Sequence, residues 1–285
     1  MKTKGLISIG LIIIVLAVVF LYVIFPGMAK LPEDYEQEYS FEGSVQVYVS
    51  SLGVLVPIET KMTRTLEATG ITDDDVLLLK QDITFFEATS GAPLGAINPA
   101  LAALNTSEVY GLDRTDRTNV PGEGDMSRSG QFTFPAGVEQ QTYQYWSSST
   151  RSTLPATFVK EETYEGINVY VFEINSNGNP YTADETTGLP RTMDVYAKIR
   201  VEPVSGVPVY ALSRTTINLQ HPVAGSMPVL INESAYTSAT INEMVDLAKS
   251  TSNLILWASV YGFWILIGVG GLLLLIGIVN TVRSK

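Results

Sequence analysis

The sequence predicts a mainly β ectodomain, either an antiparallel sandwich or a barrel-like sheet, flanked by an N-terminal and a C-terminal transmembrane α-helix. Three observations lead to this fold class. Each end of the chain has a long apolar segment without any charged residue. Between them, apolar and polar residues alternate in short runs that turn residues separate. The chain also has no cysteine, which excludes a disulfide scaffold, a thiolate zinc site and cysteine catalysis.

The first apolar segment, residues 5–25, predicts a transmembrane helix. Sixteen of its residues are Leu, Ile, Val or Phe. A bilayer core needs about 20 helical residues, so the segment is long enough to span it. A cleaved signal peptide is the alternative, because Gly27 and Ala29 are small residues that a peptidase accepts. The apolar run exceeds the usual signal core of about 7–15 residues, which favours an uncleaved anchor.

The second apolar segment, residues 254–279, has the same composition and predicts a second transmembrane helix. The tails at residues 1–4 and 280–285 each contain two basic residues and no acidic one, so the positive-inside rule places both in the cytoplasm. The residues from 30 to 253 contain 14 basic and 29 acidic residues, a net charge of −15. We therefore expect a two-span protein of the cytoplasmic membrane with its large domain outside.

The outer part divides into an extracellular β domain over residues 30–233 and a juxtamembrane helix over residues 234–253. In the strand around Val195, apolar residues from Met193 to Val201 alternate with polar ones, which indicates one buried and one solvated face. The strand candidates are 45–49, 60–69, 76–86, 131–134, 142–147, 167–174, 193–201 and 207–219. Residues Ile241, Met244, Val245 and Ala248 recur at helical spacing and predict the juxtamembrane helix. A second, short helix is expected at 99–104.

Catalytic signatures are missing from the sequence. It contains no G-x-S-x-G elbow, no phosphate-binding loop, no H-E-x-x-H motif and no EF-hand loop. His221 is the only histidine, and we interpret it as an imidazole that is hydrogen-bonded at a loop junction. The three acids Asp73 to Asp75 are interpreted as a solvated turn rather than a cation site. We therefore predict that the protein is not an enzyme and has no metal site and no cofactor.

An alternating charged cluster is formed by Asp113, Arg114, Asp116 and Arg117. Arginine binds carboxylate or phosphate groups with two hydrogen bonds, so the cluster could recognise an anion. An ion-pair network that braces a turn is the preferred interpretation.

An aromatic group is formed by Tyr143, Tyr145 and Trp146. These side chains could line an apolar groove for an acyl chain, although core packing accounts for such residues more often. The sequons that begin at Asn105 and Asn232 fit the N-glycosylation acceptor pattern and lie in the part predicted to be outside.

Several short motifs resemble a known family. The motifs are Val109-Tyr-Gly-Leu-Asp-Arg114, Gly130-Gln-Phe-Thr-Phe-Pro135, Tyr143-Gln-Tyr-Trp146, Pro155-Ala-Thr-Phe158, Glu162-Thr-Tyr-Glu-Gly-Ile167, Tyr170-Val-Phe172 and Val201-Glu-Pro-Val-Ser-Gly206. They are similar to the porin-PorA-like family, a domain of unknown function of actinobacteria and archaea, and the resemblance implies an anchor–ectodomain–anchor layout. The family often has an aromatic–acid pair where this chain has Ser147-Ser148-Ser149. The porin name implies an outer-membrane channel, whereas two apolar helices fit a cytoplasmic membrane.

These features lead to one functional hypothesis and one alternative. The leading hypothesis is a cell-surface, non-enzymatic integral membrane protein that binds or carries lipid or envelope components. The alternative is a structural or adhesive envelope protein whose acidic exterior meets other surface proteins. Membrane lipids are the expected partners, with envelope proteins or lipid-linked glycans as further candidates, and homo-oligomers are compatible with either hypothesis. A net charge of −11 for the whole chain argues against nucleic acid as a partner.

Overall fold

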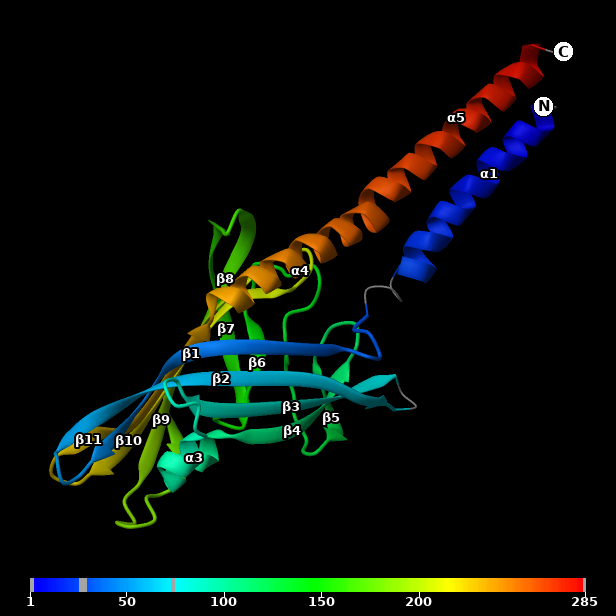
Figure 1. Cartoon of the computed structure of the whole chain (residues 1–285). Coiled ribbons are helices and arrows are strands. Elements are labelled where there is room, and N and C mark those ends of the chain that lie inside the picture. The colour runs from blue at the N-terminus through cyan, green and yellow to red at the C-terminus, as the bar shows by residue number, and fades with distance from the viewer. Residues whose placement is uncertain (1–2, 26–29, 73–74, 284–285) are drawn as a thin grey trace. The chain divides into compact units, whose positions relative to one another are not determined.

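The computed structural model describes residues 3–25, 30–72 and 75–283. The chain divides into two compact units, one made of residues 1–30 and 249–285 and the other of residues 31–248. Figure 1 shows long helices at both ends of the chain and a β-rich domain between them in the sequence. The predicted fold class is thereby confirmed.

The terminal unit is helical. The helix α1 (Thr3–Val19) continues into the short π-helix η1 (Phe20–Ile24), while α4 (Ser238–Leu256), η3 (Trp257–Tyr261) and α5 (Gly262–Arg283) follow one another. By length and composition, 5–23 and 238–283 each contain an apolar helix that can cross a membrane. The ends of the two tails, residues 1–2 and 284–285, and the small residues Gly27 and Ala29 lie outside the described residues.

The helices α1 and α5 lie side by side (Figure 1). Gly10 and Gly270 face each other at their contact, since a Cβ atom on Gly10 would lie 2.6 Å from the carbonyl oxygen of Gly270. Ala17 and Gly277, one heptad further along each helix, are also buried. Small residues allow two helix backbones to approach closely, so they set the distance between these helices.

The β domain is built on one antiparallel sheet in the order β5-β4-β3-β2-β1-β11-β10-β9-β8-β7-β6. Every neighbouring pair is antiparallel, and only the β1–β11 pair joins strands that are distant in the sequence. The strands are β1 (Glu36–Val49), β2 (Val54–Ile71), β3 (Val76–Glu87), β4 (Thr106–Asp113), β5 (Asn119–Gly124), β6 (Tyr143–Ser147), β7 (Ser152–Tyr164), β8 (Ile167–Tyr181), β9 (Arg191–Val201), β10 (Pro208–His221) and β11 (Gly225–Tyr236).

The segment around Gln131 connects the two edges of this sheet. Gln131 forms an antiparallel bridge with Thr118 beside β5 and a parallel bridge with Tyr145 in β6. Its backbone N–H donates to the carbonyl of Gln144 at 2.6 Å, and its carbonyl accepts from the N–H of Trp146 at 2.8 Å. Between the two predicted alternatives, the structure therefore has the barrel-like sheet rather than the sandwich.

The structure extends and corrects the predicted elements. Residues 131–134 form only this bridge and no strand, while β4, β5, β7 and β11 were not predicted. β11 ends at Tyr236 and α4 begins at Ser238, so the predicted boundary between residues 233 and 234 falls inside a strand. The short helix at 99–104 is confirmed as the 3-10 helix η2 (Pro99–Leu104), which follows α3 (Leu94–Ile97).

The first turns of α4 cover one part of the domain core. Met244, Val245 and Ala248 are buried, and Ile241 packs beside them. Thr240 fixes the helix start, since its hydroxyl accepts from the N–H of Ser40 at 3.0 Å. The apolar spacing that predicted the juxtamembrane helix is thus the face that packs against the core.

Candidate functional site

The β domain contains a partly open cavity of about 690 Å³. Its lining comes from every strand except β5 and from the hairpin between β6 and β7. Because alternate residues of a strand share a face, one residue in two points inward. In β9, the inward set is Met193, Val195, Ala197 and Ile199, which is the apolar set of the alternation in the sequence.

Most of the cavity wall is apolar. The larger contributions are Phe41, Met62, Leu66, Leu79, Phe85, Phe132, Leu154, Ile174, Ile217, Leu230 and Tyr236. These residues come from both buried clusters of the domain, so the cavity lies between two packed regions. The polar remainder of the wall is substantial, so the cavity as a whole suits an amphipathic molecule better than a purely apolar one.

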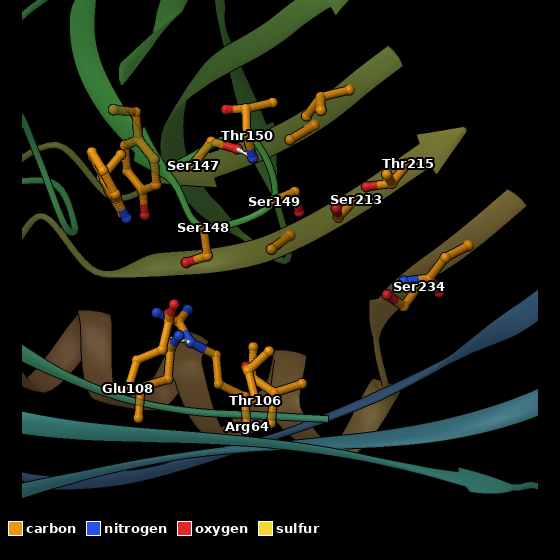
Figure 2. A pocket seen from close by; sticks show the side chains of 18 of the residues that line it. Arg64, Thr106, Glu108, Ser147, Ser148, Ser149, Thr150, Ser213, Thr215 and Ser234 are labelled. Atoms are coloured by element: carbon orange, nitrogen blue, oxygen red, sulfur yellow. Dashed lines mark hydrogen bonds between the residues drawn. The ribbon is translucent and has the colours of Figure 1, made fainter. Parts of the chain in front are cut away.

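Polar side chains collect in one region of the wall. Figure 2 shows Arg64 on β2 with Thr106 and Glu108 on β4, and across the cavity a group of hydroxyl side chains. This hydroxyl group, here called the hydroxyl rim, consists of Ser147, Ser148, Ser149, Thr150, Ser213, Thr215 and Ser234. The cavity therefore combines an apolar wall with a localised polar region.

Arg64 is the cation of this polar region. Its Nε donates to Oε1 of Gln81 at 2.7 Å, and its guanidinium carbon lies 5.7 Å from the ring centroid of Tyr39 and 5.4 Å from that of Phe132. Burial acts to lower the pKa of Arg64, but nearby tyrosine hydroxyls, Tyr145 foremost, raise it above its ordinary value. The guanidinium therefore stays charged.

Glu108 is held by groups other than Arg64. Its Oε2 accepts from the hydroxyl of Tyr110 at 2.5 Å, and its Oε1 lies 3.7 Å from Nη2 of Arg128. Arg128 is buried over the Tyr110 ring at 4.1 Å and also pairs with Asp125 at 2.6 Å. Burial raises the pKa of Tyr110, so its hydroxyl stays protonated as a donor. The result is a polar network that begins at the cavity wall, with Glu108 and Tyr110, and continues behind it to Arg128 and Asp125.

The predicted aromatic groove is brought together only in part. Tyr145 and Trp146 line the cavity, but Tyr143 does not. Tyr143 packs against Phe134 and Phe172 with ring centroids 5.4 and 5.7 Å apart, and its hydroxyl accepts from the N–H of Glu139. Two of the three side chains thus line the cavity, and Tyr143 packs in the core; a ligand groove at Tyr145 and Trp146 stays a prediction.

In the predicted ion-pair cluster, the two aspartates bind backbone and the two arginines reach other segments. Oδ1 of Asp113 accepts from the N–H groups of Thr115 and Asp116, and Oδ1 of Asp116 accepts from the N–H of Thr118. These bonds brace the turn, but the predicted ion-pair network does not: among the described residues, the two aspartates bind backbone N–H groups and form no ion pair with the arginines of the cluster.

The two arginines of this cluster bind residues that are distant in the sequence. Arg114 pairs with Asp75 at 2.7 Å and Glu33 at 3.2 Å. Arg117 donates to the backbone carbonyls of Phe134 at 2.7 Å and Ser205 at 3.2 Å, and its burial lowers its pKa. Both therefore tie loops together and lie outside the cavity. Asp73 and Asp74 fall outside the described residues.

The sequon asparagines have different surroundings. Asn105 is exposed after η2, and its Oδ1 accepts from the N–H of Phe85 at 2.8 Å. Asn232 lies inside β11, lines the cavity and has a buried Oδ1. Glycosylation at either residue stays a prediction. Nδ1 of His221 accepts from the N–H groups of Val223 and Ala224, which is the loop-junction bonding expected for it.

Arg64 was not among the predicted site residues, although the spacing of its neighbours marks it. Arg64 follows Met62 and precedes Leu66 with the same spacing of two, so it occupies the inward register of a strand. A charged residue at an inward position of a strand predicts a polar group inside the domain. Within residues 3–25, 30–72 and 75–283, no three His, Asp or Glu side chains form a group that could hold a metal ion.

The comparisons with known proteins agree with this architecture. The model of the family described as porin PorA matches residues 4–279, which include both terminal helices and the whole β domain. No curated protein matches the sequence.

Proposed function

We propose that this chain, which belongs to the porin PorA family, is a non-enzymatic membrane protein that holds a lipid or another amphipathic envelope component inside its β domain. The observation that carries the proposal is the cavity of about 690 Å³. Its size lies within the range of about 300–1,000 Å³ that is typical of sites for small molecules. The family and the two apolar helices indicate a membrane protein, which gives such a site access to lipid.

The energetics favour an acyl chain as the occupant. Each methylene group that leaves water for an apolar wall contributes about 0.8 kcal/mol, so a long chain gains affinity from many small contributions. The hydroxyl rim and Arg64 give the other end of an amphipathic molecule polar partners. A purely polar ligand would leave most of the wall without a complementary surface.

The absence of an enzymatic activity is part of the proposal. The only histidine braces a turn through its Nδ1, so it is engaged away from the cavity. The serines of the hydroxyl rim have no histidine beside them that could act as a general base. Holding a ligand requires no such base.

We also propose an orientation for the chain. Both tails face the cytoplasm and the β domain lies outside the cytoplasmic membrane. The basic residues of the tails and the net charge of −15 over residues 30–253 support this orientation. With this orientation, the β domain can reach membrane lipids and lipid-linked glycans, which have similar tails.

The competing function is a structural or adhesive envelope protein. The acidic exterior favours it, because a strongly charged surface directs association with other surface proteins. In that case the cavity has no resident ligand, and the binding partners are other envelope proteins or further copies of the chain. The test below distinguishes the two functions.

Native mass spectrometry of the full-length, detergent-extracted protein tests the lipid proposal. We expect co-purifying lipid in the wild type and its loss in Ala197→Phe, which places a ring in the cavity. Ala183→Phe is the matched control, because Ala183 is exposed in the β8–β9 loop. Photocrosslinking in intact cells completes the test. Recovery of protein neighbours alone, with no lipid retained by the wild type, would favour the structural or adhesive function.

A further inference from the structure

We propose that the cavity selects molecules with an anionic headgroup, a carboxylate or a phosphate, and that Arg64 binds this headgroup. This inference rests on the proposed lipid-holding function and adds the chemical class of the ligand. Three features of the cavity support it: the charge of the lining, the free hydrogen-bonding capacity of Arg64 and the position of the hydroxyl rim.

The charge of the cavity is opposite to the charge of the domain around it. The outer part of the chain contains about twice as many acidic as basic residues. The charged residues that line the cavity are Arg64, Arg151 and Glu108, so its lining has one more positive than negative charge. Although the domain as a whole is acidic, a lining with a net positive charge favours an anionic group over a cationic one at short range.

Arg64 has donors left for a ligand. Its Nε is used by Gln81, whereas its two terminal nitrogens form no hydrogen bond with the described part of the chain. No carboxylate of a described residue pairs with it, since the ion pairs of Glu108 and Asp125 are made with Arg128. A guanidinium presents two parallel N–H groups, which match the two oxygens of a carboxylate or phosphate.

The surroundings of Arg64 hold the guanidinium in place before a ligand binds. Tyr39 and Phe132 lie near it, and Gln81 fixes one edge. A group that is already ordered loses little conformational entropy on binding. Arg64 is half-buried. A cation that is partly removed from water gains more from an ion pair than a fully solvated one does, so an anionic headgroup complements it.

Glu108 does not cancel this preference. Its carboxylate accepts a hydrogen bond from the hydroxyl of Tyr110 and pairs with the guanidinium of Arg128, which does not line the cavity, so the negative charge of Glu108 is already balanced. The hydroxyl of Tyr110 also lies 2.8 Å from Oγ of Ser148 in the hydroxyl rim. Serine hydroxyls can rotate to donate, so the rim supplies further donors to headgroup oxygens.

The remaining cation, Arg151, lies in the hairpin between β6 and β7, where it is exposed and has a φ of 50°. It follows directly after the serines of the rim and also lines the cavity. An exposed arginine at this position attracts anions to the cavity without being buried itself. In this arrangement Arg151 attracts the anionic headgroup to the cavity opening, and Arg64 forms the specific hydrogen bonds with it.

Photoreactive lipids that share one tail and differ only in the headgroup test the inference. The probes are hexadecanoate, hexadecyl phosphate, hexadecanol and hexadecyltrimethylammonium, each with a diazirine in the tail. The full-length protein is placed in nanodiscs of zwitterionic phosphatidylcholine, and labelled peptides are assigned to cavity strands or to the helices α1 and α5. Labelling at the helices reports partition into the bilayer, so it normalises the amount of each probe.

We expect the two anionic probes to label the cavity strands of the wild type at least about tenfold more efficiently than hexadecanol, because hydrogen bonds to a charged group are strong. Arg64→Gln should remove this preference and leave hexadecanol labelling unchanged. Arg64→Lys should retain part of it, since a lysine keeps the charge without the paired donors. Arg214→Gln, an exposed arginine on β10, is the matched control and should behave as the wild type.

The possible labelling results distinguish the headgroup inference from the lipid proposal on which it rests. Equal labelling of the cavity by charged and neutral probes in the wild type would overturn the headgroup inference but leave the lipid proposal intact, even if Arg64→Gln fails to fold. Absence of cavity labelling by all four probes would overturn the lipid proposal itself. Complete displacement of hexadecyl phosphate by inorganic phosphate at equal concentration would show a site for the free anion and contradict a lipid ligand.

Discussion

Nε of Arg64 donates to Oε1 of Gln81 at 2.7 Å, and Nε2 of Gln81 in turn lies 3.3 Å from the hydroxyl of Tyr110. Gln81 is almost fully buried, so its amide connects the cavity cation to the network around Tyr110. The substitution Gln81→Glu therefore places a carboxylate against Arg64 without a change in size. We expect anionic probes to lose about tenfold in cavity labelling, because an internal carboxylate competes for the guanidinium.

The readout for Gln81→Glu is the headgroup labelling described above. Hexadecanol should label the cavity of this variant as it labels that of the wild type, since the apolar wall is unchanged. Gln144→Glu introduces the same charge at an exposed position of β6 and serves as the control. A variant that keeps its preference for anionic probes would contradict the role of Arg64.

The ion pairs of Glu162 predict an acid-dependent contribution to stability. Hydrogen bonds from Lys160 first, and from Arg200 next, lower the pKa of Glu162 from 4.5 to about 2. Because the folded-state pKa is depressed, this contribution is fully present above about pH 4.5 and is lost as the pH falls towards 2. Glu162 and Arg200 are half-buried and Lys160 is exposed. Solvent therefore still reaches the carboxylate, and screening limits the value of the ion pairs to about 1 kcal/mol or less.

Denaturant unfolding of Glu162→Gln across this pH range measures that contribution. The difference in unfolding free energy between wild type and variant should shrink as the pH falls below about 4.5. Glu161→Gln, which removes an acid that is bound by the amides of Gln140 and Asn168, is the comparison on the same strand. A constant difference at every pH would argue against the ion pairs as its source.

Gly206 is required by the turn between β9 and β10. Its φ is +72°, and a Cβ atom there would collide with the carbonyl of Pro135. The turn is also fixed by Glu202, whose Oε2 accepts from the N–H and the hydroxyl of Ser205 at 2.7 and 2.6 Å. Gly206→Ala should thus lower the unfolding free energy by more than the roughly 1–2 kcal/mol cost of a left-handed backbone alone.

Gly178→Ala isolates the conformational part of that effect. Gly178 has a φ of +70°, but nothing lies within 4 Å of the Cβ atom that alanine adds. Thermal or denaturant unfolding of the two variants therefore separates the backbone cost from the collision with Pro135. Equal destabilisation by both substitutions would show that the Pro135 segment moves away freely.

The sequence predicted the elements whose pattern is local. The two helices follow from uninterrupted apolar segments, and β9 follows from strict alternation. The unpredicted strands break that pattern: β7 contains Pro155 and β11 contains Pro228, and proline demotes a strand assignment. In the structure, Pro228 lies opposite Asn218, at the point where the register between β10 and β11 shifts.

The cavity could not be predicted in the same way, because its residues are distant in the sequence. Tyr145 and Trp146 were expected to line a groove from their aromatic character alone. Arg64 reaches the same cavity only because the sheet curves until Gln131 connects its two edges. This closure of the sheet depends on pairing between segments that are distant in the sequence. The periodicity of a single strand carries no information about that pairing.

The contact between α1 and α5 depends on Gly270. A Cβ atom there would lie 2.7 Å from a side-chain carbon of Ile14 and 2.9 Å from the carbonyl oxygen of Gly10. Gly270→Val should therefore separate the two helices, whereas Gly271→Val should not, since nothing lies within 4 Å of its added Cβ. Fluorescence energy transfer between labels on the two tails measures this separation. Equal transfer in both variants would contradict the packing role of Gly270.

The proposed orientation predicts where thiol reagents reach the chain. The sequence has no cysteine, so single cysteines can be introduced without a background. Thr186→Cys lies in an exposed loop of the β domain and should react with a membrane-impermeant maleimide in intact cells. Cysteines at Thr3 and Ser284 should react only after permeabilisation, because basic tails stay in the cytoplasm. Labelling of either tail in intact cells would reverse the orientation and remove the β domain from the outer surface.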